Sequence, residues 1–202
     1  MIAECSYDRY FTPEEYFAWE ERQLEKHELI DGRVYGMSGG TQNHSAIKLN
    51  VALVIQGHLR GSKCRAFDSD LKVNILKTLN YTYPDLSVTC DDRDRKNPLY
   101  ITYPCLIVEV LSSSTEAYDR GRKFEKYRRN PCLVDYVLVS SEEVAIDLYH
   151  KNKAGDWMFL SYRSGEVVEL QSIDLRVPIE EFYENIVFEL EDGLQPVDGN
   201  VS

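Results

Sequence analysis

Two carboxylates stand where they could share a divalent metal ion. Glu109 interrupts the most apolar run of the chain, residues 105–111, and an acid in such a strand is costly to bury unless a metal or a cation neutralises it. A second acid, Asp85, follows Pro84 at the start of another predicted strand. Two carboxylates on neighbouring strands can hold Mg²⁺ while water and a substrate phosphate complete the octahedron. A structural salt bridge is the alternative explanation of Glu109, and the pattern leaves both open.

Basic residues gather in one short segment, residues 120–129, which contains six arginines and lysines against a single acid, Glu125. The whole chain carries a net charge of −11, which by itself disfavours a nucleic-acid partner. Seven acids and no basic residue lie in segment 178–202, however, so residues 1–177 carry a net charge of only −4. A basic helix can contact nucleic-acid phosphates, although a solvated helix face explains the pattern equally well. The candidate phosphate contacts are Arg120, Arg122, Arg128 and Arg129.

The elements before these residues are predicted from capping and turn signals. Thr12, followed by proline and two acids, predicts a helix over residues 12–25. Residues 27–37 predict a hairpin that turns at an Asp-Gly pair, residues 31–32. A second helix, capped by Asn43 and with apolar residues at helical spacing, is predicted to end near residue 61.

From residue 64 onward the pattern changes to strands. The predicted strands are residues 64–67, 71–75, 83–89, 105–111, 134–139, 144–149 and 157–162. The basic segment forms a helix that begins at Ser114 or Thr115 and ends before Asn130 and Pro131, because a residue that precedes proline leaves the helical region. This strand–helix–strand step predicts one parallel pair inside an otherwise antiparallel sheet.

The predicted fold class is therefore α/β (α+β), with a mixed central sheet flanked by helices and an added antiparallel flank. We expect one domain over residues 1–202. Within it, residues 1–43 form an N-terminal helix and hairpin decoration, and residues 178–202 form an acidic C-terminal segment with a short helix at 179–183.

Composition restricts where the protein works. The chain is 43% hydrophobic and contains no apolar run of the length that a membrane span needs. Its first residues lack the basic and apolar regions of a signal peptide, so we expect a cytoplasmic protein. Five cysteines are scattered without a C-x-x-C pair, which favours reduced thiols. Four histidines show no zinc-type spacing.

Three segments of the chain carry recognisable motifs: residues 83–88 (YPDLSV), 106–112 (LIVEVLS) and 119–127 (DRGRKFEKY). They resemble the Uma-two family, which is abundant in cyanobacteria, described as "putative restriction endonucleases" and placed in the PD-(D/E)XK nuclease superfamily. The resemblance extends from TPEEY at residues 12–16 to residues 182–183, and thus over nearly the whole chain. It implies a restriction-endonuclease-like core of a helix, a three-strand meander, a helix and a parallel strand.

The resemblance also implies that Asp85 and Glu109 bind Mg²⁺ or Mn²⁺, with the Val110 carbonyl as a further ligand. The superfamily pattern has a lysine two residues after the acid, but Leu111 stands there in this chain. We hypothesise that Lys123, on the following helix, supplies the missing ammonium, which would hold the attacking water or offset phosphate charge. Lys126 is the reserve candidate.

Other residues are supporting candidates. Lys123 lies four residues from both Asp119 and Tyr127, on one helical face, so a surface ion pair with Asp119 is its simpler explanation. Three further residues match the family pattern: Glu28, Asp70 and His44. Glu28 is a candidate for an added metal ligand, and Asp70 for an acid that contacts the metal ligands and not the metal itself. A hydrogen bond at the helix N-terminus explains His44 equally well.

Together these features predict a Mg²⁺-dependent endonuclease that hydrolyses DNA phosphodiester bonds. We expect a homodimer, since cutting two strands suits two-fold symmetry. Two alternatives remain. One is a catalytically inactive binding or assembly module, which the missing strand lysine and the net charge of −11 favour. The other is a nuclease for RNA or structured DNA ends.

Overall fold

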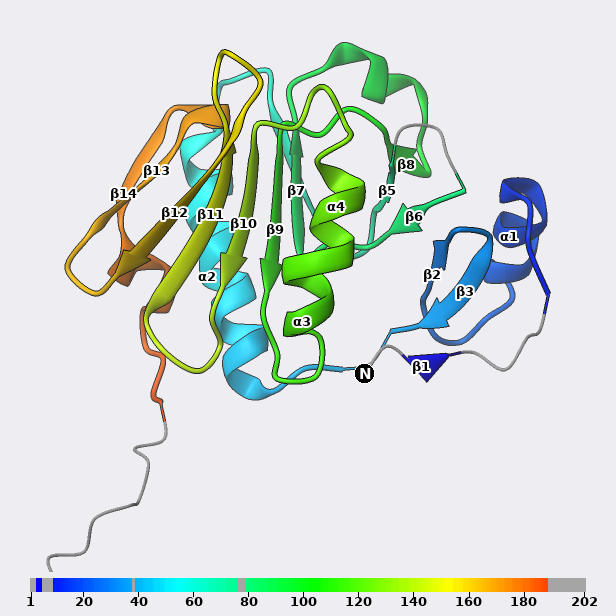
Figure 1. Cartoon of the computed structure of the whole chain (residues 1–202), viewed down its shortest axis with the longest axis horizontal. Helices are drawn as coiled ribbons and strands as arrows, with labels where there is room; N and C mark the ends of the chain where they lie inside the picture. Colours follow the sequence, from blue (N-terminus) through cyan, green and yellow to red (C-terminus); the bar gives the residue numbers. More distant parts are fainter. Residues whose placement is uncertain (1–2, 5–8, 38, 76–78, 189–202) are drawn as a thin grey trace, which may run out of the picture.

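The computed structural model describes residues 3–4, 9–37, 39–75 and 79–188. Its main sheet has six strands in the order β12-β11-β10-β9-β7-β4 (Figure 1). β9 and β10 are parallel, with Glu109 opposite Leu138, and the other neighbouring pairs are antiparallel. The predicted mixed sheet with one parallel pair is confirmed. The strands are β4 (Arg65–Asp68), β7 (Leu86–Thr89), β9 (Leu106–Val110), β10 (Asp135–Val139), β11 (Ala145–Lys151) and β12 (Trp157–Arg163).

Helical segments cover both faces of this sheet (Figure 1). α2 (Gln42–His58) packs on one face through Ile47, Val51 and Ile55. The connection from β9 to β10 packs on the other. This connection comprises α3 (Glu116–Tyr118), the π-helical turn η2 (Asp119–Lys123) and α4 (Phe124–Tyr127).

The alternation of side chains along β9 decides where Glu109 points. Val108 and Val110 pack in the apolar cluster beneath α2, whereas Ile107 and Leu111 pack in the cluster beneath α4. Side chains two apart on a strand share a face, so Glu109 faces the η2 and α4 side. Leu111, at the position of the missing lysine, is buried in that cluster, and its replacement by lysine would bury an ammonium among apolar groups.

The N-terminal hairpin belongs to a second six-stranded sheet, of order β1-β3-β2-β6-β5-β8. Because β2 pairs with β6 through Leu29 and Tyr81, the predicted decoration is hydrogen-bonded to later parts of the chain. α1 (Pro13–Glu20) packs beside it through the cluster of Phe11, Tyr16, Leu29 and Tyr81. The strands are β1 (Ala3–Glu4), β2 (His27–Ile30), β3 (Arg33–Gly36), β5 (Lys72–Asn74), β6 (Tyr81–Thr82) and β8 (Tyr100–Ile101).

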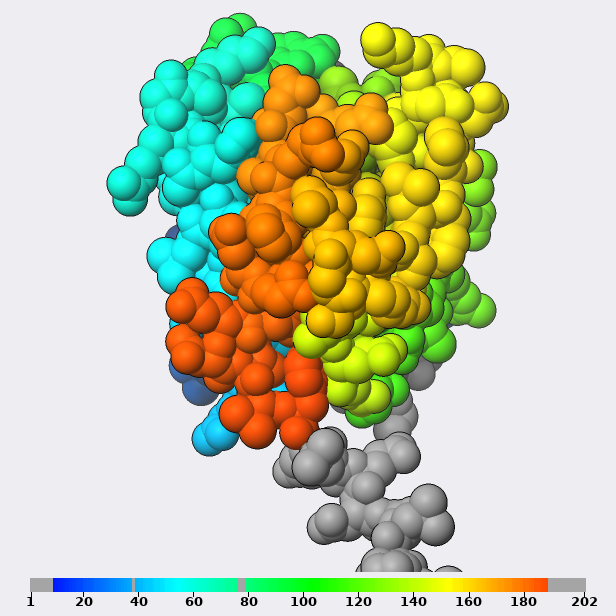
Figure 2. All heavy atoms as spheres, turned by 90° about the vertical axis from the view of Figure 1, so that its left-hand side faces the viewer, coloured from blue at the N-terminus to red at the C-terminus, as the bar shows by residue number. Residues whose placement is uncertain are grey.

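The C-terminal part covers the α2 side of the main sheet. β13 (Val167–Leu170) and β14 (Leu175–Pro178) form a two-stranded sheet, followed by the 3₁₀ turn η4 (Ile179–Tyr183). Figure 2 shows these elements on the surface between α2 and β12. The Asn50 side chain on α2 donates to the carbonyl of Glu184 at 2.9 Å. Two further 3₁₀ turns are η1 (Asp92–Lys96) and η3 (Gln171–Ile173). Residues 189–202 of the acidic segment lie outside the described residues.

Two helix boundaries differ from the prediction. α1 ends at Glu20 and not near residue 25, because the next backbone bonds are tighter, from the Arg22 amide to the Trp19 carbonyl, and turn the chain into β2. The N-cap of α2 is Thr41, whose hydroxyl accepts from the His44 amide at 3.2 Å. Asn43 lies inside the helix, and its side chain donates to the Val187 carbonyl.

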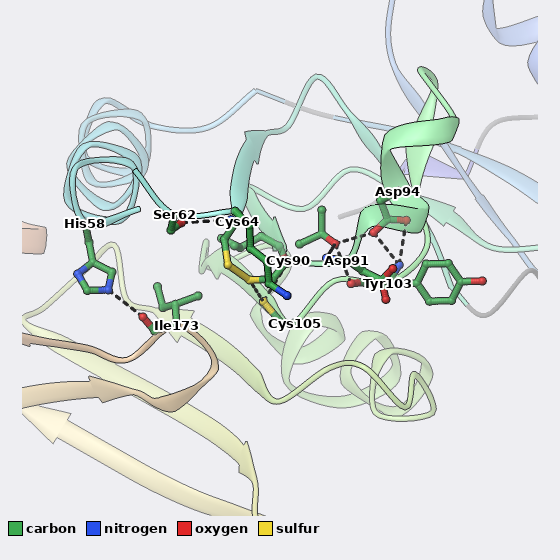
Figure 3. The surroundings of a disulfide bond; sticks show 12 residues. His58, Ser62, Cys64, Cys90, Asp91, Asp94, Tyr103, Cys105 and Ile173 are labelled. Carbon is green, nitrogen blue, oxygen red and sulfur yellow. Dashed lines mark hydrogen bonds between the residues drawn. A yellow bond between two sulfur atoms is a disulfide. The ribbon is translucent and has the colours of Figure 1, made fainter. Parts of the chain in front are cut away.

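The expectation of reduced thiols is wrong for Cys64 and Cys90, which form a disulfide (Figure 3). The antiparallel register of β4 and β7 pairs Arg65 with Thr89, so the next positions, Cys64 and Cys90, face each other with Cα atoms 4.0 Å apart. Their sequence separation of 26 carries no disulfide signal. Among the described cysteines, Cys105 and Cys132 are free thiols.

Loss of this disulfide should destabilise the fold. A cross-link over a separation of 26 residues restricts the unfolded chain, and its removal should cost about 3 kcal/mol of the free energy of unfolding. In a chain of this size that lowers Tm by about 6–12 °C. Thermal unfolding of the double variant Cys64→Ser/Cys90→Ser, with Cys132→Ser as the matched control, measures the effect. An equal Tm for the double variant and the control would contradict the cross-link.

None of the helices formed by the described residues has the length and apolar character needed to cross a bilayer.

Candidate functional site

Asp85 and Glu109 line the same pocket, a hollow of about 110 Å³. Its walls come from the β2–β3 hairpin, the loop before α2, the end of β9 and the α3–η2 segment. The acidic and basic side chains that line it are Glu28, His44, Asp85, Glu109, Asp119 and Lys123. The predicted metal ligands, the predicted lysine and two of the supporting candidates are thus brought together.

A backbone hydrogen bond fixes the Asp85 carboxylate beside β9. The Val110 amide donates to Asp85 Oδ2 at 2.8 Å, which places this oxygen next to the residue that follows Glu109. Asp85 precedes β7, and β7 pairs with β9 through Leu86 and Val108. The two acids therefore come from adjacent strands of the main sheet, as the sequence predicted.

Lys123 reaches the pocket from the π-helical turn and contacts three acids. Its Nζ lies 2.8 Å from Glu109 Oε1, 3.5 Å from Asp119 Oδ1 and 3.8 Å from Glu28 Oε1. The lysine is 6% exposed and Glu109 is 4% exposed. The Lys123–Asp119 contact is therefore not the surface ion pair of the simpler explanation, because both residues are buried.

The pocket holds four carboxyl groups and a single lysine. Burial raises the pKa of Glu109 well above its usual range, and the neighbouring Asp119 and Asp85 carboxylates act in the same direction. Burial opposes the charged form of Lys123, but Glu109, Glu28 and Asp119 together raise the pKa of its ammonium. Four carboxylates face one ammonium, and a bound cation would relieve this imbalance.

His44 contacts the Asp85 carboxylate from the N-terminal turn of α2. Its Nε2 lies 3.5 Å from Asp85 Oδ2. Burial alone would raise the pKa of Asp85, but hydrogen bonding from His44 and from the Val110 amide lowers it. Gly40 leaves room for the imidazole, because a Cβ at that position would lie 2.6 Å from His44 Nδ1.

The oxygen-rich lining fits a hard divalent cation. In the described part of the chain, no three His, Cys, Asp or Glu side chains converge into a ready-made cage. Mg²⁺ does not need one, since it keeps several waters and is commonly held by one or two carboxylates. Asp85, Glu109 and the backbone of Val110 are the residues of this pocket that would hold such an ion.

Several predicted residues lie elsewhere. Asp70 forms an ion pair with Lys26 on the surface, where its side chain is 77% exposed. Lys126, the reserve candidate, lies 2.5 Å from Asp31 Oδ2 of the hairpin turn and does not line the pocket. Tyr127 is buried behind Lys123, and its hydroxyl lies 2.5 Å from that of Thr82.

The four predicted phosphate contacts differ in their surroundings. Arg120 is held by Glu116 and Asp147, each at 2.6 Å. Arg129 pairs with Glu125 on the helix surface, and the Arg128 guanidinium lies over the Phe124 ring. Arg122 is exposed. As none of the four lines the carboxylate pocket, their contact with phosphate stays a prediction.

Three features of the pocket were not expected from the sequence: the burial of Asp119, a hydrogen bond accepted by Glu28, and a wall of small residues. Asp119 is a buried acid of the site, although its spacing of four from Lys123 was the available signal. Glu28 also accepts a hydrogen bond from the Tyr83 amide at 2.9 Å, which ties the hairpin to the segment that carries Asp85. Small residues of the loop before α2, Gly39 and Gly40, complete one wall.

Comparison with known proteins agrees with this architecture. The Uma2 family model, described as "Putative restriction endonuclease", matches residues 13–180. "Uncharacterized protein slr1290" from Synechocystis sp. (strain ATCC 27184 / PCC 6803 / Kazusa) is 55% identical over 177 residues, 88% of this chain and 93% of that protein. "Uncharacterized protein sll1609" from the same organism is 30% identical over 109 residues, 53% of this chain and 62% of that protein.

A crystal structure of "a putative nuclease belonging to DUF820" from Anabaena variabilis ATCC 29413 superposes with a TM-score of 0.70 at 18% identity, covering 84% of this chain and 96% of that one. The fold is therefore a mixed α/β fold of the nuclease type. The chain belongs to the Uma2 family, whose description as "Putative restriction endonuclease" places it with nucleases, hydrolases that act on nucleic acids.

Proposed function

We propose that this protein is a Mg²⁺- or Mn²⁺-dependent endonuclease that hydrolyses phosphodiester bonds of DNA. The observation that carries the proposal is the composition of one pocket, in which Glu28, Glu109 and Asp119 contact Lys123 and a fourth acid, Asp85, lines the same hollow. Buried carboxylates in such excess are costly unless a cation joins them. The membership in a nuclease family supplies the reaction class.

Each residue of the pocket has a role in the proposal. Asp85 and Glu109 hold the ion, and the Val110 carbonyl is a further ligand. When bound, such an ion lowers the pKa of a coordinated water and offsets phosphate charge. Lys123 holds the attacking water by a hydrogen bond from Nζ, or offsets phosphate charge as a fixed cation. His44 positions the Asp85 carboxylate through its contact at 3.5 Å.

A homodimer belongs to the proposal as well. Cleavage of both strands of a duplex needs two hydrolytic events on strands of opposite direction, and a pair of subunits related by a two-fold axis presents two such pockets.

A cleavage assay tests the proposed function. Supercoiled plasmid, linear duplex, single-stranded DNA and RNA are incubated with Mg²⁺, with Mn²⁺ and with EDTA. We expect DNA to be cut internally with either metal and to stay intact in EDTA. Cleavage of RNA alone would redirect the proposal to a ribonuclease. Intact substrates under every metal condition, with a folded protein, would support the inactive binding module.

A further inference from the structure

A second hollow, of about 410 Å³, lies between the turn of the β2–β3 hairpin and the helical segment that follows β9. Its volume falls in the range of small-ligand sites. The hairpin lines it with Ile30, Asp31 and Tyr35, and the helical segment with Tyr118, Arg122, Glu125, Lys126 and Arg129. We refer to these eight residues as the hairpin groove.

The hairpin groove adjoins the carboxylate pocket. Tyr35 lines the groove and Gly36 the pocket; Tyr118 lines the groove and Asp119 the pocket; Arg122 lines the groove and Lys123 the pocket. Consecutive Cα atoms are about 3.8 Å apart. The two hollows are therefore lined by neighbouring residues in three places along the chain, and a nucleic acid bound in the pocket has the groove beside it.

The two hollows carry opposite charge. The pocket has four carboxylates and one lysine, whereas the groove has three basic residues and two acids. Arg122 is exposed and makes no ion pair with any residue of the described chain. Arginine binds phosphate through two parallel N–H groups, so Arg122 is the best placed residue of the groove for a backbone phosphate.

The groove also offers aromatic surface. Tyr35 and Tyr118 are half-buried and come from opposite walls. The Tyr118 hydroxyl is buried, and its charged neighbours are Glu28, Lys123 and Asp119 of the carboxylate pocket, so this wall offers a ligand the ring of Tyr118 and not its polar atom. Stacking of an unpaired base on a tyrosine ring stabilises single-strand complexes and tolerates any base, since every base has a π-face.

One contact crosses the groove. Lys126 on α4 lies 2.5 Å from Asp31 on the hairpin turn. A phosphate in the groove competes with Asp31 for this ammonium and is repelled by its carboxylate. The carboxylate of Asp31 therefore opposes anion binding at the point where Lys126 and Arg122 favour it.

We propose that the hairpin groove binds an unpaired nucleotide next to the phosphodiester held in the carboxylate pocket, with its phosphate on Arg122 and its base against Tyr35 and Tyr118. The inference rests on the proposed function and names its substrate class, a nucleic acid with a single-stranded segment at the cut. A base inside a duplex is stacked on its neighbours and reaches such a groove only after it is flipped out.

Binding without cleavage tests the groove. Fluorescence anisotropy of a labelled 12-nucleotide single strand, a blunt duplex of that length and the same sequence as RNA is measured in EDTA, over a series of salt concentrations. We expect the single strand to bind more tightly than the duplex. Arg122→Ala should weaken single-strand binding by about 5–10-fold and reduce the slope of log Kd against log salt by about 0.7, the value for one phosphate contact in a single strand.

Two variants give effects of opposite sign. Tyr35→Leu should weaken binding by at least about 5-fold. Asp31→Asn should tighten it by about 3–10-fold, because it removes a competing carboxylate. Asparagine is also tolerated at the positive φ of 51° that this turn position has. Arg176→Ala, an exposed arginine on β14 with a carboxylate partner, is the charge control and should leave binding unchanged.

Other results overturn the proposal. Duplex binding as tight as single-strand binding, with Tyr35→Leu neutral, excludes a site for an unpaired nucleotide. Arg128 lies outside the groove. Equal losses of affinity from Arg122→Ala and from Arg128→Ala would show that binding depends on the overall positive charge of the helix and not on the groove. Because EDTA prevents metal-dependent cleavage, failure of groove binding and failure of the nuclease activity are separate results: tight binding with an inactive enzyme retains the groove and rejects the proposed function.

Discussion

Asp85→Asn should abolish metal-dependent cleavage, with a loss of at least about 10³-fold in rate. The substitution keeps an oxygen that can accept from the Val110 amide, the bond that positions Asp85 at 2.8 Å, but removes the charge that would hold the ion. The same change should remove stabilisation by metal. A ligand present at 100 times its Kd stabilises the folded parent by about 2.7 kcal/mol, or about 5–10 °C in Tm for this chain length.

The metal-free variant provides a second readout. Asp85→Asn removes one of the four carboxylates that line the pocket, and not one of the three that contact Lys123, so in EDTA its free energy of unfolding should stay within about 1 kcal/mol of the parent value. Asp70→Asn is the matched control, because Asp70 is a surface acid that pairs with Lys26 outside the pocket. The control should cleave DNA and gain Tm with Mn²⁺ like the parent. If Asp85→Asn also kept both properties, Asp85 would not be a metal ligand.

The sequence predicts the part of the site that depends on strand order. The apolar run around Glu109 is buried on both faces and lies parallel to β10, and Pro84 places Asp85 at the start of β7. Both follow from local pattern, because a buried strand needs continuous apolar residues and a parallel neighbour needs a helical crossover. The position of Leu111 in the core also follows, since it shares the face of Ile107.

The rest of the site depends on contacts between distant residues. Asp119 reaches Lys123 from four residues away on the same helical segment. Glu28 precedes Lys123 by 95 positions, and only the docking of the β2–β3 hairpin on η2 brings the two together. Lys126 follows Lys123 by three residues and is the reserve candidate from the sequence. In the folded protein, Asp31 of the hairpin turn pairs with Lys126 and holds it away from the pocket.

The Cys64–Cys90 disulfide was missed for a similar reason. Cysteine spacing predicts pairing only within known frameworks, whereas this pair depends on the register of two strands.

The predicted helix boundaries are wrong by a few residues. Threonine and asparagine are both good N-caps, and the choice of Thr41 over Asn43 depends on the bond from Asn43 to the Val187 carbonyl, 144 positions along the chain.

Lys123→Met should lower the free energy of unfolding more than any other single substitution in the pocket. The ammonium lies within 4 Å of Glu109, Asp119 and Glu28, and removal of one partner of a buried ion pair costs about 3–5 kcal/mol. We expect that loss in EDTA, together with a fall in cleavage of about 10²–10³-fold. Divalent metal should raise the Tm of the variant by more than it raises that of the parent, since the ion would then be the main cation in the pocket.

Two further variants separate a role in the reaction from a role in folding. Lys123→Arg keeps the positive charge and should recover most of the lost stability, but a planar guanidinium cannot replace a compact ammonium beside the water, so cleavage should stay low. Lys151→Met removes a half-buried lysine that donates to the Pro131 carbonyl at 2.8 Å and does not line the pocket, and this variant should cleave like the parent. Thermal unfolding and plasmid cleavage are measured for all three with Mn²⁺ at temperatures where each is folded. A folded Lys123→Met protein that cuts DNA at the parent rate would show that Lys123 only neutralises the buried acids.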